Sequence, residues 1–141
     1  MADTVQVRLR TVGDGPTALA EAGPFTLTVD RPSAAGGGGL GFNGGQLLYL
    51  SIAACLSNDL YREAATMGIE LDGVEVRVEG EFAGRGAASS TIAVDLTIRS
   101  AAPEARLREL VAEVERVAEI PRSIREATPI AVATTIEASP G

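Results

Sequence analysis

Seven of the ten residues from 36 to 45 are glycine, and an apolar run over residues 47–56 follows at once. Such a glycine content predicts an irregular loop, because glycine adopts turn conformations that other residues avoid. No repeat of fixed period and no domain linker is found, so the loop joins two structured segments rather than two domains. At this length of 141 residues, we predict a single domain over residues 1–141.

The residues around the apolar run predict a long helix. Asn43 can cap the helix start while Gln46 reaches back to it, a variant of the capping box, and Gly68 can end the helix. We therefore expect a helix over residues 44–67. Its first half, residues 47–56, is apolar nearly all round, which is typical of a helix that is buried at its start.

Alternation of apolar and polar residues predicts five strands. A period of two is typical of a strand with one face toward a core. The segments that show it are residues 5–9, 25–29, 74–82, 92–98 and 130–136. We interpret the first two as a hairpin and expect antiparallel sheets.

A second helix begins near Pro103, because apolar residues follow it at steps of three and four as far as Ala118. Pro121 interrupts this pattern, and a short helical turn is expected over residues 122–126. The predicted order of elements is therefore ββα ββ αβ. This order places the chain in the α+β class.

The composition excludes several kinds of function. The chain has no histidine, so Ser-His-Asp, Cys-His and zinc sites as usually built are excluded, and we expect neither a metal nor a cofactor. A net charge of -7 opposes binding to nucleic acid or to an anionic membrane. No signal peptide or membrane-spanning run is found, and a single cysteine fits a reducing compartment. We expect a soluble, cytoplasmic protein.

Two further patterns carry little weight. The run Gly39–Gly44 satisfies GxGxxG before a helix, but glycine-rich sequence matches that motif by chance, and no parallel βαβ unit follows. The carboxylates alternate on strands or lie on the polar sides of helices, as solvated surface groups do. We therefore expect neither a dinucleotide site nor a carboxylate pair for acid-base catalysis.

Cys55 is the only cysteine of the chain and therefore the only candidate for a thiol nucleophile. A lone cysteine in an apolar helix is usually a small buried hydrophobe with inert sulfur. A reactive thiolate needs a nearby cation or a helix N-terminus, yet Asp59 follows one turn later and Arg62 only two turns later. The local sequence therefore does not activate Cys55.

Four segments form one pattern, namely Val29–Pro32, Gly36–Gly39, Gly41–Leu48 and Ala53–Cys55. The pattern closely resembles that of the OsmC/Ohr superfamily, the osmotically inducible protein C-like and organic hydroperoxide resistance-like proteins. The resemblance implies antiparallel sheets and a long buried central helix that carries the peroxidatic cysteine. It also implies an intertwined homodimer, in which two such helices lie back to back at the interface.

The resemblance further implies a peroxidase chemistry, from which this chain departs. In the superfamily a helix cysteine attacks an organic hydroperoxide, a second cysteine resolves the sulfenic acid, and an Arg and a Glu assist. Cys55 matches the peroxidatic position. Ile120 stands where the resolving cysteine would precede a proline, Gly44 and Gly45 replace a Pro-Glu pair, and the turn at residues 11–15 has no cation.

Our first hypothesis is a divergent OsmC-like dimer whose interface pocket near Cys55 binds or transforms a small apolar molecule, with the two-cysteine cycle lost. Loss of the Pro-Glu side chains at Gly44 and Gly45 would enlarge the space above the helix start and bare its N–H donors. We expect the pocket to be lined by Phe42, Asn43, Gly44, Gly45, Leu48, Ser51, Ile52 and Ile120.

Two alternatives stay open. The first is a one-cysteine organic hydroperoxide reductase for oxidative stress defence, in which an external thiol resolves the sulfenic acid at Cys55. The second is a family remnant that serves only as a dimeric interaction module.

Overall fold

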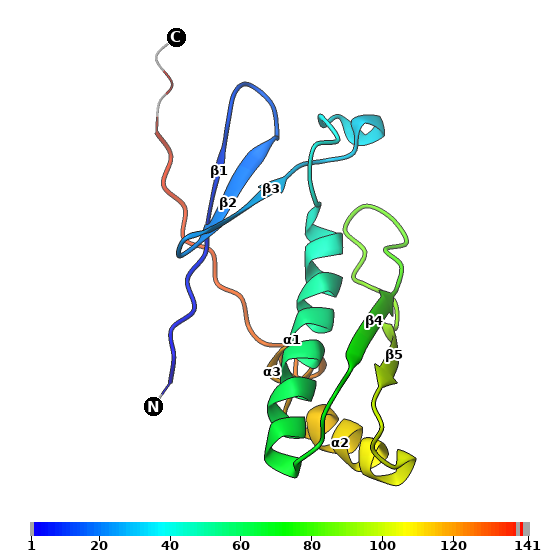
Figure 1. The fold of residues 1–141 in the computed structure, drawn as a ribbon. Coiled ribbons are helices and arrows are strands. Elements are labelled where there is room, and N and C mark those ends of the chain that lie inside the picture. The colour runs from blue at the N-terminus through cyan, green and yellow to red at the C-terminus, as the bar shows by residue number, and fades with distance from the viewer. Residues whose placement is uncertain (1, 138, 140–141) are drawn as a thin grey trace. The chain divides into compact units, whose positions relative to one another are not determined.

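The computed structural model describes residues 2–137 and 139, and the chain forms two compact units. The first unit contains the residues up to Ala54 together with Val76–Leu96. The second unit contains Cys55–Glu75 and the residues from Thr97 onward. Helices and antiparallel strands are combined along the chain, so the predicted α+β class is confirmed (Figure 1).

The N-terminal strands form a three-stranded antiparallel sheet in the order β1-β2-β3, over Arg8–Thr11, Ala18–Ala22 and Phe25–Val29. A hairpin of two strands was expected here, and the middle strand was not predicted. β2 reads Ala-Leu-Ala-Glu-Ala, which carries neither β-branched nor aromatic residues. Pairing on both edges therefore outweighs its low intrinsic propensity for strand.

The long helix α1 spans Gly44–Met67, as predicted. The side chains of its start exchange the expected hydrogen bonds, since Asn43 Oδ1 accepts from the Gln46 N–H and Gln46 Oε1 accepts from the Asn43 N–H, both at 2.9 Å. Gly68 follows the last turn with a φ of 69°, which favours glycine. Burial of the first half is incomplete, because Leu50 remains 46% exposed while Ile52 is buried.

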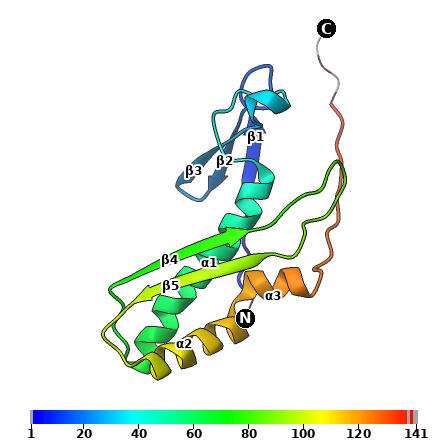
Figure 2. The same ribbon diagram turned by 90° about the vertical axis from the view of Figure 1, so that its right-hand side faces the viewer.

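Strands β4 (Gly73–Glu79) and β5 (Ala93–Arg99) form a two-stranded sheet, close to the predicted positions (Figure 2). The connection between them is folded back on itself by a bridge between Phe82 and Ser89. Together with α1, these two strands contribute residues to both units.

Helix α2 spans Glu104–Val117, and α3 spans Glu119–Arg125. The break between them falls at Ala118, whose backbone is extended, rather than at Pro121. Pro121 lies in the first turn of α3, where a missing N–H costs nothing because those donors have no partner within the helix. In the described residues, no helix is both long and apolar enough to cross a membrane.

The predicted last strand, residues 130–136, is not part of a sheet in the described chain. Ile130 and Ile136 are each 90% exposed, and Val132 is 85% exposed. A strand exists through hydrogen bonds to a neighbour, and the two sheets contain only β1 to β5 of the described residues. Residues 130–136 therefore have the alternating sequence of a strand but do not pair with any strand of the described chain.

Candidate functional site

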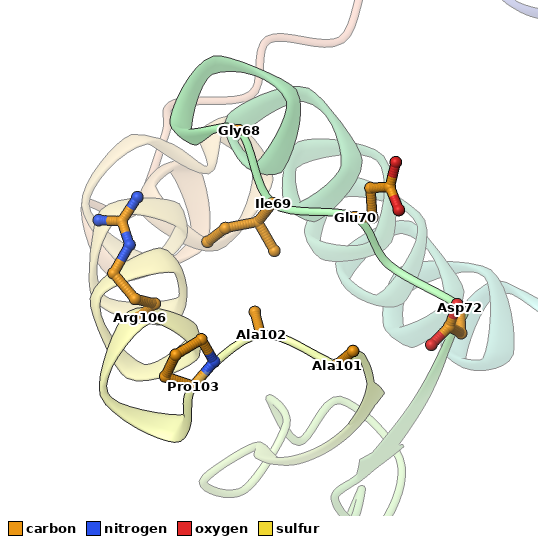
Figure 3. A pocket seen from close by; sticks show the side chains of 8 residues that line it. All are labelled: Gly68, Ile69, Glu70, Asp72, Ala101, Ala102, Pro103 and Arg106. Atoms are coloured by element: carbon orange, nitrogen blue, oxygen red, sulfur yellow. The ribbon is translucent and has the colours of Figure 1, made fainter.

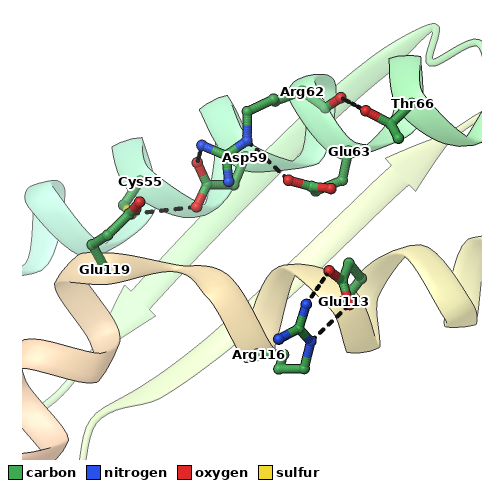
Figure 4. Close-up of polar contacts among 8 residues, drawn as sticks. All are labelled: Cys55, Asp59, Arg62, Glu63, Thr66, Glu113, Arg116 and Glu119. Atoms are coloured by element: carbon green, nitrogen blue, oxygen red, sulfur yellow. Dashed lines mark hydrogen bonds and ion pairs between the residues drawn. The ribbon is translucent and has the colours of Figure 1, made fainter. Parts of the chain in front are cut away.

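Cys55 lies half-buried on α1, between two carboxylates of the second unit (Figure 4). Its Sγ is 3.7 Å from Asp59 Oδ2 and 3.9 Å from Glu119 Oε2. Asp59 follows by four residues, so both side chains lie on one helix face. Glu119 is the first residue of α3 and comes from 64 residues away in the sequence.

The surroundings of Cys55 disfavour the thiolate. Burial raises the pKa of the Cys55 thiol, and the negative charges of Asp59 and Glu119 raise it further. Hydrogen bonding with the backbone at the start of α3 lowers the pKa but does not cancel the rise. Cys55 therefore remains a neutral thiol at neutral pH, in which form it is a weak nucleophile.

Arg62 brings a positive charge close to this cluster but directs it at carboxylates. Its Nη1 lies 3.0 Å from Asp59 Oδ1, and its Nε lies 2.9 Å from Glu63 Oε1 (Figure 4). Asp59 is only 4% exposed, and a buried carboxylate is stabilised by a partner of opposite charge. The guanidinium stabilises Asp59 and is no activator of the thiol.

A cation is conceivable at the same cluster, because the ligand atoms of Cys55, Asp59 and Glu119 lie within 4.8 Å of one another. Thiolate and carboxylate are both metal ligands. Arg62 already compensates the charge of Asp59, however, and the thiol would have to lose its proton first. The donor set therefore gives no reason to assign a metal.

The glycine-rich loop before α1 is held by the buried carboxylate of Asp30. Asp30 accepts hydrogen bonds from Thr17 Oγ1 at 2.9 Å and from the N–H groups of Arg31, Gly38 and Leu40 at 2.7, 3.3 and 3.2 Å. Burial alone would raise the pKa of Asp30, but the four hydrogen bonds outweigh it and hold the pKa below its ordinary value. The ionised side chain thus fixes the loop that leads into α1.

The space beside Gly45 is filled by an aromatic ring. A Cβ atom on Gly45 would lie 3.1 Å from Cε2 of Phe82. The Phe82 ring is stacked on Tyr49, with centroids 5.8 Å apart and planes inclined by 18°, and Tyr49 Oη lies 2.7 Å from Ser89 Oγ. We expected open space above the helix start. At Gly45 the Phe82 ring occupies that space, whereas a Cβ on Gly44 would have no atom within 4 Å.

A hollow of about 280 Å³ adjoins the first half of α1 in the first unit. Its lining consists of Phe42, Gln46, Tyr49, Leu50, Ala53, Val76 and Val78. Phe42 is the predicted pocket residue that the structure places there.

The other predicted pocket residues are placed elsewhere. Asn43 caps α1, Ser51 Oγ donates to the carbonyl oxygen of Leu48, and Ile52 is buried. Leu48 and Ile120 are partly exposed, and Ile120 belongs to the second unit.

Three residues around these features were not predicted, namely Tyr49, Phe82 and Glu119. Asp59 was expected one turn after Cys55, and it lies next to the sulfur. Tyr49 stands out as the one hydroxyl-bearing aromatic in the apolar run. Nothing in the sequence reveals Phe82 or Glu119, because both reach their places through long-range folding.

A further hollow of about 420 Å³ lies where α1 ends and α2 begins (Figure 3). Ile69 and Ala102 face it from opposite sides (Figure 3). Arg106 lines it too, but its guanidinium lies 2.8 Å from Glu109 and donates to the carbonyl oxygen of Met67 at 2.9 Å. With these donors engaged and Glu70 and Asp72 nearby, this hollow is not suited to an anion.

Comparisons with known proteins give one matching family model and several solved structures of similar fold. The family profile described as OsmC-like protein matches residues 36–133. No curated protein sequence matches the chain.

Several solved structures resemble the chain over most of its length. An OsmC-like protein from Mycoplasma pneumoniae has a TM-score of 0.78 at 18% identity, with 89% of each chain covered. An organic hydroperoxide resistance protein from Legionella pneumophila has a TM-score of 0.64 at 22% identity, covering 89% of this chain and 91% of that one. A Vibrio cholerae protein with captopril bound in one of its active sites has a TM-score of 0.64 at 22% identity, covering 89% and 88%. At these identities the likeness shows the fold.

Proposed function

Because this chain belongs to the OsmC-like family, we propose that it forms a homodimer whose pocket near Cys55 binds or transforms a small apolar molecule. In this proposal the two-cysteine peroxidase cycle is lost, since the chain has one cysteine and Ile120 occupies the resolving position. We place the protein in the cytoplasm, because a single free thiol suits a reducing compartment.

The observation that carries the proposal is the pair of carboxylates around Cys55. A peroxidatic cysteine must be a thiolate, which is stabilised by positive charge. Here Asp59 and Glu119 lie within 4 Å of the sulfur and raise the pKa of its thiol. This arrangement argues against Cys55 as an efficient nucleophile and supports the loss of the peroxidase cycle.

Uncovered apolar residues at both ends of the chain support the homodimer. Val5 and Val7 near the N-terminus are exposed, as are Ile130, Val132 and Ile136 near the C-terminus. Exposed apolar residues in alternation are what a strand leaves open when its partner comes from another chain. A second copy would supply that partner.

A small ligand is supported by two observations. The fold accommodates one in a relative, since the Vibrio cholerae structure holds captopril in one of its active sites. In this chain the hollow beside α1 is lined almost entirely by apolar side chains, and Gln46 is its one amide. Apolar walls with a few polar groups are typical of ligand pockets.

The second candidate is a one-cysteine organic hydroperoxide reductase in oxidative stress defence. Partial exposure of Cys55 favours it, because a peroxide could reach the sulfur. The thiolate would attack a peroxide oxygen, the O–O bond would break, and the alkoxide would leave as the alcohol after taking up a proton. Two external thiols would then reduce the sulfenic acid, giving water and their own disulfide, and restore Cys55.

Reduction of cumene hydroperoxide by dithiothreitol separates the two candidates. We expect wild-type protein and Cys55→Ser to be equally slow at pH 7, close to the rate without protein. A wild-type rate at least about tenfold above that of Cys55→Ser, a difference of about 1.4 kcal/mol in barrier height, would establish the reductase instead. Mass spectrometry of Cys55 after peroxide treatment checks whether sulfenic acid is formed.

A further inference from the structure

Tyr49 is held in one position by three neighbours on the connection between β4 and β5. Phe82 stacks on its ring, Ser89 Oγ contacts its hydroxyl oxygen at 2.7 Å, and Gly80 allows close approach of the backbone. A Cβ on Gly80 would lie 2.8 Å from Cζ of Tyr49, so a larger residue there would displace the ring. Gly45 permits the stack in the same way, because its missing side chain leaves room for Phe82.

The fixed ring of Tyr49 lines two hollows of opposite character. The larger one, of about 590 Å³, also contains Glu79 and Glu81, which oppose anions and place charge beside any apolar ligand. The smaller one, of about 280 Å³, has no charged residue in its lining. Its volume lies just below the range of about 300–1,000 Å³ that is typical of ligand pockets, so it suits an occupant of about one or two rings.

We propose that the smaller hollow binds a small uncharged aromatic molecule, which packs against the ring of Tyr49. The uncharged lining offers no partner to an ionised ligand and therefore favours neutral ones. An aromatic ligand gains more from Tyr49 than a saturated one of equal size, because ring pairs attract beyond their buried area. Gln46 Oε1 is engaged by the Asn43 N–H, so its Nε2 is the donor that remains for a ligand oxygen.

This inference rests on the proposed function and specifies its ligand class. The test measures binding of 2-naphthol and of its saturated counterpart, decahydro-2-naphthol, to the full chain at pH 7. Both probes have ten ring carbons and one hydroxyl group, so they differ mainly in aromaticity. The variants are Tyr49→Leu, Tyr49→Phe and, as a matched control, Tyr61→Leu, which changes the other tyrosine of the chain.

We expect Tyr49→Leu to lose at least about threefold more affinity for 2-naphthol than for decahydro-2-naphthol. Tyr49→Phe keeps the ring and should retain the preference, and Tyr61→Leu should change neither affinity. In wild-type protein, proton NMR should show nuclear Overhauser effects between 2-naphthol and the Tyr49 ring. This last measurement also decides the matter if Tyr49→Leu does not fold.

Other results would overturn the inference in distinguishable ways. If wild-type protein binds only the saturated alcohol, the aromatic site is overturned while the proposed function stands. If it binds neither probe, the aromatic site is overturned, and the proposed function is overturned as well only if no other small apolar molecule binds. If Tyr49→Leu turns a dimer into a monomer and leaves both affinities unchanged, a second copy of the chain covers the hollow and the site is overturned.

Discussion

The reactivity of Cys55 is set by the two side chains that face its sulfur. Removing one negative charge should lower the pKa of the thiol and enlarge the thiolate fraction at neutral pH. We therefore expect Glu119→Gln to be alkylated by iodoacetamide several-fold faster than wild-type protein at pH 7.5, with the pH profile shifted downward. Glu115→Gln on α2 is the control, and equal rates in all three proteins would contradict this description of the cluster.

Asp30 gives the stability of the glycine-rich loop a pH dependence of known sign. The hydrogen bonds to its carboxylate lower its pKa in the folded state, so their stabilisation is complete above the unfolded pKa, near 3.8, and declines as the pH falls further. Asp30→Asn should thus lower the melting temperature by several degrees at pH 7 and by less at pH 3. The exposed Asp95→Asn serves as control. A difference that stays constant between the two pH values would refute this role.

At the scale of single residues, the sequence could predict contacts between side chains that are one helical turn apart. The exchange of hydrogen bonds between Asn43 and Gln46 was expected from their spacing, and it is present. The unfavourable setting of Cys55 was expected from Asp59, and the raised pKa agrees with it. Glu119 could not be predicted, because its position depends on where α3 begins.

At the scale of elements, Gly45 on α1 and Phe82 on the connection between β4 and β5 should be coupled in their effect on stability. A double-mutant cycle can measure this coupling. Alanine is favoured over glycine in a helix by about 0.5–1 kcal/mol. In the wild-type background a Cβ on Gly45 would press on Phe82, so Gly45→Ala should gain little or lose stability. In the Phe82→Leu background it should gain stability, measured by urea unfolding. Equal effects of Gly45→Ala on stability in both backgrounds would show that the Phe82 ring does not contact a side chain at position 45.

The elements differ in how much of them could be predicted. The bounds of α1 follow from caps that lie next to it in the sequence. β2 was not predicted, because its alanine-rich sequence forms a strand only by pairing with β1 and β3. For residues 130–136 the reverse applies, since alternation predicts a strand but the described chain offers no partner.

For the whole molecule, the homodimer proposal makes the exposed face of residues 130–136 essential. We expect Val132→Lys to weaken or abolish dimerisation, because it would bury an unpaired charge. Ala133→Lys, one residue later and on the opposite face of an extended segment, should leave the dimer intact. Light scattering during size-exclusion chromatography over a range of concentrations measures both. A wild-type monomer, or equal behaviour of the two variants, would contradict the proposed interface.

Membership of the OsmC-like family could be predicted from the sequence, because all four segments of the pattern lie close together between Val29 and Cys55. The hollow beside Tyr49 could not be predicted from the sequence, because it depends on the positions of β4 and of the connection that follows it. Replacement of Pro-Glu by Gly44 and Gly45 suggested an open space. At Gly45 the fold places Phe82 in it instead.

The central claim is that this chain binds a small apolar molecule without using Cys55 as a nucleophile. Native mass spectrometry of wild-type protein and Cys55→Ser, each incubated with the same panel of small apolar molecules, tests it most directly. We predict that both proteins retain the same ligands, with affinities within about threefold of each other. Absence of any bound molecule in wild-type protein, or loss of binding in Cys55→Ser together with a covalent adduct on Cys55 in wild-type protein, would contradict the claim.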